Sequence, residues 1–230
     1  MLYGVFHGDL HGGNLLVEPG GRTVLFDFGI TGRLAEPQRL AFLRLLLAGT
    51  AGDVKGQLAA LRDLGAFPVD TDLAAVFQDL ELDQPVKDPT QMSATEMVDE
   101  LQGLVSKLLG YGAQAPKDLM LFVKNLMFLD GSIATLAPDL DLFAEVESIA
   151  LMFATKHGEQ IMAQLGLEQQ KDWTPDLTGV KASFGLDEST EHLTHRELQA
   201  RRAEVREKFT GQRRSRASSR SRSRSRRPRP

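Results

Sequence analysis

The sequence contains no cysteine. Disulfide bonds, thiolate nucleophiles and cysteine-ligated zinc sites are therefore excluded. The opening residues, 1–6, are too short and too uncharged for a secretory signal peptide. No uninterrupted apolar run approaches the ~18 residues that span a bilayer, so we expect no transmembrane segment. These absences predict a cytoplasmic protein, with peripheral membrane association as the alternative.

Charge is unevenly distributed along the chain. Residues 213–230 contain nine arginines and no acidic residue, which leaves residues 1–212 with 18 basic and 31 acidic side chains. An acidic body argues against nucleic-acid binding by the fold itself. The basic tail suits contact with nucleic acid or an anionic membrane. A disordered, solubilising extension is the other interpretation, and it is favoured because no aromatic residue interleaves the arginines.

The chain divides into three zones. Residues 1–34 predict strands around a glycine-rich loop, with 15–17 and 23–26 forming a hairpin across the turn at 19–21. Residues 36–170 show helical apolar spacing. Residues 171–210 predict a polar linker and a charged helix, and 211–230 a disordered tail rich in arginine and serine. The expected fold class is mainly α with a small β-hairpin.

Several helix boundaries have local signals. Pro37 suits the first turn of a helix. Ser93-Ala-Thr-Glu96 is a capping box. Pro116 opens a long apolar helix, and Pro138 separates it from the next one. Gly110-Tyr-Gly112 imitates a dinucleotide fingerprint but follows a helix, so it predicts a helix end instead.

The residues with chemical potential lie in His7-Gly-Asp9-Leu-His11-Gly-Gly-Asn14 and Phe26-Asp27-Phe28-Gly29. Phosphoryl transfer needs a carboxylate beside the acceptor hydroxyl and oxygen ligands for the metal that bridges the phosphates. Asp9 suits the catalytic role, and Asn14 and Asp27 suit the metal, because the spacing follows that of a catalytic loop and an Asp-Phe-Gly segment. Magnesium is the natural ion for such ligands.

Four further residues support this site. His7 is expected to hold the loop against the segment that contains Phe28 and Gly29. For His11, a solvent-facing imidazole and a substrate contact stay equally open. A plain glycine-rich turn would need neither histidine nor the second motif.

The two motifs, together with Gly32-Arg-Leu34, resemble the UbiB/AarF-type atypical kinases, the family of the coenzyme Q kinase-like proteins. The stretch from Leu121 to Gly131 and Ala137-Pro-Asp-Leu-Asp-Leu142 are also similar to the helical C-lobe of that family. The resemblance covers roughly residues 1–165. Gly12 departs from the pattern, because the family usually has proline there.

The resemblance implies the C-lobe of a protein-kinase-like fold that uses Mg²⁺ and ATP for phosphoryl transfer or ATP hydrolysis. It implies Asp9 as the catalytic aspartate and Asn14 and Asp27 as ligands of the metal–nucleotide complex. It also implies a link to quinone or lipid metabolism. Only six residues precede His7, so the nucleotide-binding N-lobe is missing from this sequence, and we expect the chain alone to have little or no activity.

Three alternatives remain. An aminoglycoside/choline phosphotransferase shares the first motif and a following aspartate. A dinuclear metallophosphatase shares the Asp-x-His corner but needs further metal ligands from several loops. A C-lobe fragment acting as a non-catalytic scaffold is the third. The side chains Met120, Phe122, Met127 and Phe128 suit a lipid or quinone pocket, although packing between helices is the more ordinary explanation.

Overall fold

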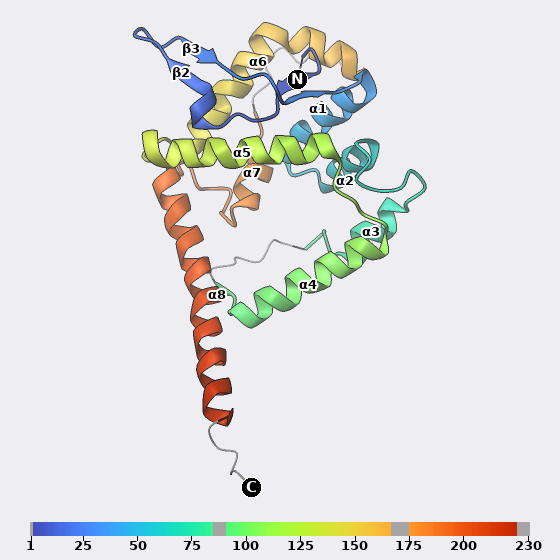
Figure 1. The fold of residues 1–230 in the computed structure, drawn as a ribbon. Helices are drawn as coiled ribbons and strands as arrows, with labels where there is room; N and C mark the ends of the chain where they lie inside the picture. Colours follow the sequence, from blue (N-terminus) through green and yellow to red (C-terminus); the bar gives the residue numbers. More distant parts are fainter. Residues whose placement is uncertain (1, 85–90, 167–174, 225–230) are drawn as a thin grey trace.

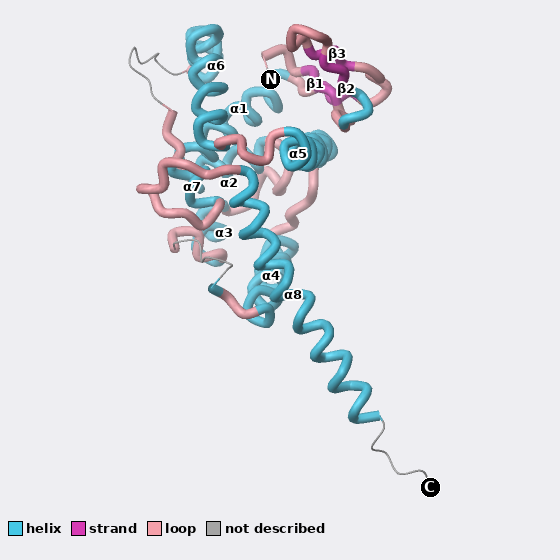
Figure 2. Tube along the Cα trace, turned by 90° about the vertical axis from the view of Figure 1, so that its left-hand side faces the viewer, coloured by secondary structure: helices cyan, strands magenta, loops and turns pink. Residues whose placement is uncertain are grey.

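The structure, a computed structural model, describes residues 2–84, 91–166 and 175–224. It is mainly helical, as the sequence predicts, and it has two small two-stranded sheets where the sequence predicted a single hairpin (Figures 1 and 2). The elements in chain order are β1 (Val5–His7), η1 (Gly12–Asn14), β2 (Leu15–Val17), β3 (Thr23–Leu25), β4 (Thr31–Arg33), α1 (Glu36–Ala51), α2 (Val54–Asp63), α3 (Leu73–Asp79), α4 (Ala94–Gly110), α5 (Lys117–Leu136), α6 (Leu142–Leu165), α7 (Thr178–Ser183) and α8 (His195–Arg224).

The N-terminal region forms two antiparallel strand pairs. The predicted hairpin is confirmed, with Leu16 of β2 opposite Val24 of β3. The second pair was not predicted: β1 pairs with β4, and Phe6 lies opposite Gly32. The glycine-rich loop leaves β1 and enters β2, so it connects the two sheets.

A small core attaches these strands to the helices. Leu34 after β4 packs with Ala41 and Phe42 of α1, and Phe6 and Phe122 lie against this cluster. The rings of Phe42 and Phe122 meet edge to face, with centroids 4.7 Å apart. Burial of aromatic surface in this geometry stabilises the contact between α1 and α5. The core thereby fixes β1 and β4 relative to α5.

The predicted helix boundaries largely agree with the structure. Ser93 and Glu96 form the expected capping box at the start of α4. Pro116 caps α5, and α4 ends at Gly110 before Gly112 with its positive φ of 73°. The helix-end interpretation of that glycine pair is confirmed.

Helix α5 crosses the molecule beneath the β2–β3 hairpin (Figure 1). Among the described residues it is the one helix that could cross a membrane by length and composition, and the absence of a transmembrane segment stays a prediction. Length and composition alone do not establish a span. Within the described part of the chain no residue of α5 is fully buried, and Met127 is 71% exposed.

Helix α8 projects away from the body (Figures 1 and 2). Its helical backbone continues to Arg224, whereas the sequence predicted a charged helix within residues 171–210 and disorder from residue 211. Arginine is a good helix former, and extending an existing helix requires no new nucleation. Residues 225–230 of the predicted tail lie outside the described residues.

Candidate functional site

The loop between β1 and β2 is closed by its own side chains. His11 caps the short helix η1, and its Nδ1 accepts the N–H of Gly13 at 3.0 Å. Asn14 is buried, and its Nδ2 donates to the carbonyl oxygen of Asp9 at 2.9 Å. The side-chain nitrogen Nδ2 of Asn14 is thus used within the loop, and Oδ1 is the side-chain atom that could bind a ligand.

His7 joins the loop to the Asp-Phe-Gly segment, as the sequence predicted. Its Nδ1 accepts the N–H of Asp9 at 3.1 Å, so the other nitrogen carries the proton of the neutral ring. That nitrogen, Nε2, lies 2.9 Å from the carbonyl oxygen of Phe26 and donates to it. The ring also lies 5.2 Å from the ring of Phe28, between centroids. One imidazole therefore binds both motifs.

Asp27 is the residue directly after Phe26, which His7 contacts. The N–H of Phe26 donates to the carbonyl oxygen of Asn14 at 2.9 Å, so the chain leaves the hairpin beside the loop. Asp27 has a φ of 51°, a left-handed conformation uncommon for residues other than glycine. Its Oδ1 accepts the N–H of Gly29 at 3.1 Å. The carboxylate is exposed and makes no ion pair within the described residues.

Two adjacent residues of α5 complete the loop's surroundings, and sequence reasoning gave neither of them a role. Asn125 accepts the N–H of Leu10 at 2.9 Å and donates to the carbonyl oxygen of His7. Lys124 places its Nζ 2.6 Å from Oδ1 of Asp9. The available signal was a Lys-Asn pair inside an apolar helix, where each polar group needs a partner.

The electrostatics of the loop favour an ionised Asp9. The hydrogen bond from Lys124 is the main cause that holds the pKa of the Asp9 carboxyl below its ordinary value. Nε2 of His11 lies 3.9 Å from the other carboxylate oxygen. The ring of His11 packs edge-on against Phe128, at 5.8 Å between centroids. His11 therefore contacts α5 as well as Asp9.

The donor chemistry of the site fits magnesium. Asn14 and Asp27 offer hard oxygens, and Mg²⁺ is usually held by one or two carboxylates together with phosphates and waters. No group of three or more histidine, aspartate or glutamate side chains suited to a metal occurs in residues 2–84, 91–166 and 175–224. A dinuclear phosphatase centre would require such a group.

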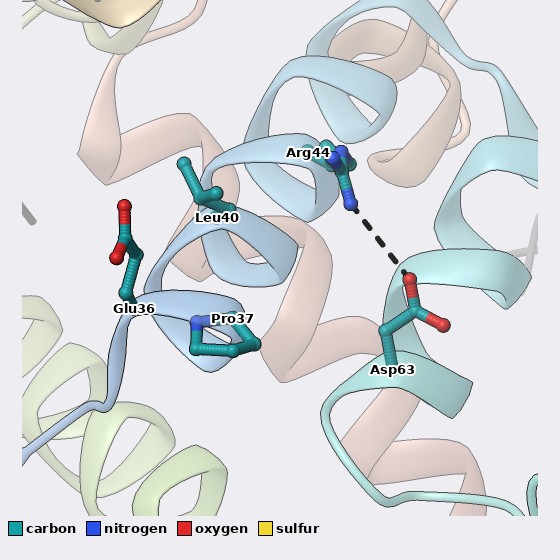
Figure 3. A pocket seen from close by; sticks show the side chains of 5 residues that line it. All are labelled: Glu36, Pro37, Leu40, Arg44 and Asp63. Carbon is teal, nitrogen blue, oxygen red and sulfur yellow. Dashed lines mark ion pairs between the residues drawn. The ribbon is translucent and has the colours of Figure 1, made fainter. Parts of the chain in front are cut away.

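A hollow of about 500 Å³ lies away from these residues, between α1 and α2 (Figure 3). Glu36, Pro37 and Leu40 line it, with Arg44 and Asp63 facing each other at 3.9 Å across one side. It contains none of the predicted site residues.

Comparison with known proteins agrees with the geometry. Residues 1–60 match the family model described as the ABC1 atypical kinase-like domain. These residues are similar to that domain. The matched region contains both motifs, the two strand pairs and all of α1. The ABC1 region thus includes both motifs of the site, whereas Lys124 and Asn125 of α5 lie outside it.

Curated relatives extend the similarity along the chain. An uncharacterized aarF domain-containing protein kinase of Arabidopsis thaliana, described as chloroplastic, is 32% identical over 164 residues, which is 61% of this chain and 30% of the relative. An uncharacterized protein of Mycobacterium tuberculosis strain H37Rv is 26% identical over 188 residues, covering 74% and 34%. The chain spans about a third of the length of these relatives. No solved structure matches it.

Proposed function

We propose that residues 1–34 and α5 form the metal- and phosphate-binding half of a Mg²⁺-ATP-dependent phosphoryl-transfer site, the C-lobe half of a kinase-like fold. One observation carries the proposal: the ring of His7 and the carbonyl oxygen of Asn14 bind the loop to the Asp-Phe-Gly segment through their hydrogen bonds to Phe26. A plain turn would have no reason to join two such motifs. The match of residues 1–60 to the ABC1 atypical kinase-like domain supports the same activity.

Each residue has a distinct task in this proposal. Bound magnesium would offset phosphate charge as the phosphoryl group is transferred. Asn14 and Asp27 supply its protein ligands. Asp9, kept ionised, faces the acceptor hydroxyl, orients it and takes its proton. His7 keeps these groups in register because it contacts both segments that contain them.

Binding of magnesium tripolyphosphate tests the metal and phosphate half, since this probe has no adenine. Titration calorimetry should show that tripolyphosphate binds only with Mg²⁺. Asp27→Asn should lose this binding, because an amide is a poorer metal ligand than a carboxylate. Asp70→Asn, an exposed change outside the site, is the matched control. Equal binding by wild type and Asp27→Asn would refute the assignment.

Catalysis by the whole family member is a further part of the proposal. The motifs found in these 230 residues do not include the family's nucleotide-binding lysine. They also do not include its acidic partner or the alanine-rich loop. Losing one aimed charge typically costs ~10²–10³ in rate. We therefore expect the 230-residue polypeptide, assayed alone, to show little ATP turnover. Turnover that Asp27→Asn abolishes would contradict this expectation.

A lipid or quinone connection belongs to the same proposal. It is supported by the exposed side chains of Met120 and Met127 on α5, which are 51% and 71% accessible. Phe122 packs into the core instead, and Phe128 lies beside His11. Sedimentation with neutral lipid vesicles, compared between wild type and Met127→Gln, tests the peripheral membrane association. Anionic vesicles test the basic tail separately.

A further inference from the structure

Lys124 places a cation against the carboxylate of Asp9. The Nζ–Oδ1 distance is 2.6 Å, and the two side chains are 40% and 24% exposed. The pair therefore lies at the surface of the site, where a ligand can reach it. An ion pair this exposed contributes little to folding stability. Its position next to the catalytic loop calls for another explanation.

The N-terminal region has few cations of its own. Residues 1–34 contain no lysine and only two arginines, Arg22 and Arg33. Arg22 is paired with Glu18 at 2.6 Å in the β2–β3 hairpin, and Arg33 lies in β4. Among the residues that the structure describes, Lys124 is the one lysine or arginine within ion-pair distance of Asp9. The phosphate half of the site would otherwise present Asp9 and Asp27 to a polyanion.

Holding the loop in place does not require Lys124. Asn125 already attaches the loop to α5 through Leu10 and His7. Phe128, one turn further along α5, has its ring centroid 5.5 Å from the Lys124 ammonium. This contact keeps the ammonium directed toward the loop. Anchoring of the backbone and placement of the charge are thus divided between two adjacent residues.

Phosphoryl transfer develops charge on the phosphoryl oxygens, and lysine or arginine clamps stabilise such charge. We propose, on the basis of the function proposed above, that Lys124 is the phosphate-binding cation of this site. It contacts an oxygen of the transferred phosphoryl group of a magnesium-bound nucleoside triphosphate while it stays beside Asp9.

The step balances without an additional reagent. The acceptor hydroxyl oxygen forms a bond to the γ-phosphorus as the bond from that phosphorus to the β–γ bridging oxygen breaks. The electron pair of the broken bond leaves on the nucleoside diphosphate. The acceptor proton passes to the Asp9 carboxylate. Lys124 keeps its protons and contributes only its charge and a hydrogen bond.

The test uses the full 230-residue chain and magnesium tripolyphosphate. Lys124→Gln should weaken binding about tenfold or more, the usual effect of losing a charged hydrogen bond. Lys124→Arg should retain binding within about threefold, because it keeps the charge. Lys117→Gln removes an exposed lysine from the same helix and should bind as the wild type does. The ³¹P resonance of the terminal phosphates in the Lys124→Gln complex should differ from that in the wild-type complex. The Lys117→Gln complex should give the wild-type resonance.

Asp9→Asn separates phosphate binding from a merely structural role. If Lys124 binds phosphate, removal of the Asp9 charge leaves tripolyphosphate binding unchanged or stronger, opposite in direction to Lys124→Gln. Equal weakening by both variants would mean that the ion pair only orders the loop, and it would overturn the inference. Unchanged binding in Lys124→Gln would do the same.

The two proposals fail in different ways. If Asp27→Asn loses binding and Lys124→Gln does not, the proposed function stands and the role of Lys124 is wrong. If the wild-type chain binds no magnesium tripolyphosphate, or if Asp27→Asn binds it equally well, the proposed function is overturned and this inference with it. Thermal unfolding of each variant shows whether it is folded when binding is measured.

Discussion

The side chain of Asn125 accepts the backbone N–H of Leu10 at 2.9 Å, across 115 positions of sequence. The same amide donates to the carbonyl oxygen of His7. Both ends of one amide group are therefore used by one loop. A side-chain amide on a helix that binds two backbone groups of a distant loop fixes both the position of that loop along the helix and its orientation.

Asn125→Ala should loosen this attachment. The change removes both partners from partly buried backbone groups, which typically costs about 1–3 kcal/mol. Hydrogen exchange should show faster exchange of the Leu10 amide. The control is Ser132→Ala, which removes a hydrogen bond within α5 itself and should leave the loop protected. Equal protection of Leu10 in wild type and Asn125→Ala would contradict the role assigned to this side chain.

Gly12→Pro is expected to stabilise the loop. Gly12 is the first residue of η1, whose N–H has no partner inside the helix. Apart from its two chain neighbours, no residue has an atom within 4 Å of a Cβ added there. His11 before it is extended, with φ −85° and ψ 162°, as a residue preceding proline requires. We expect a gain of about 0.4–1 kcal/mol through a more restricted unfolded chain.

Gly13→Pro is the matched comparison for that prediction. The N–H of Gly13 donates to Nδ1 of His11, and proline would remove this donor. It should therefore destabilise the loop while its neighbour stabilises it. Urea unfolding of both variants measures the difference, and a loss of stability in Gly12→Pro would show that the loop needs freedom at that position.

Local signals account for what the sequence predicted correctly. The capping box at Ser93 and the proline at Pro116 act within one helical turn, so their effect is readable without the fold. The β2–β3 hairpin likewise depends on a short turn. His7 was expected to join the two motifs, and both of its ring nitrogens are used in that way.

Contacts between distant segments account for what the sequence did not predict. The pairing of β1 with β4 depends on Phe6 meeting Gly32, and β4, Thr31–Arg33, has no apolar side chain that would mark it as a strand. The approach of Lys124 to Asp9 depends on how α5 lies on the core around Phe42. No spacing within the sequence specifies that placement, because it is set by packing.

Gly32→Ala should disrupt the unpredicted strand pair. A Cβ at this position would overlap the ring of Phe6, and Phe6 is held by the core around Phe42. Overpacking of this kind typically costs about 1–3 kcal/mol. Gly49→Ala is the control: nothing lies within 4 Å of its added Cβ, and alanine inside α1 should add about 0.5–1 kcal/mol. Thermal unfolding should move in opposite directions for the two variants.

Asp130 of α5 is hydrogen-bonded to three side chains of α8. It accepts hydrogen bonds from Nε2 of the buried His195 at 3.0 Å, from Gln199 at 3.2 Å and from Arg202 at 2.7 Å. Burial by itself would raise the pKa of Asp130, but the hydrogen bonds from Arg202 and His195 outweigh it and lower that pKa. The carboxylate is therefore favoured in the folded state.

The direction of the pH effect follows from that lowered pKa. A group whose pKa is depressed by folding stabilises the protein above its unfolded pKa of about 3.9, and this contribution is lost as the pH falls through the folded value. Asp130→Asn should thus weaken the attachment of α8 to α5 at neutral pH. In acid, the variant and the wild type should differ less in this attachment, because the wild-type carboxylate is then protonated as well. Hydrogen exchange of α8 amides between pH 3 and pH 7 measures this.

Asp139→Asn is the control. Asp139 also pairs with a residue of α8, Arg196, but its side chain is 73% exposed. An exposed ion pair contributes little to stability, so this change should hardly alter the protection of α8. If Asp130→Asn and Asp139→Asn changed the protection of α8 equally at neutral pH, the hydrogen bond between Asp130 and the buried imidazole of His195 would not be what holds α8. In that case the apolar contacts of Leu198 with Phe143 would have to hold α8 in place.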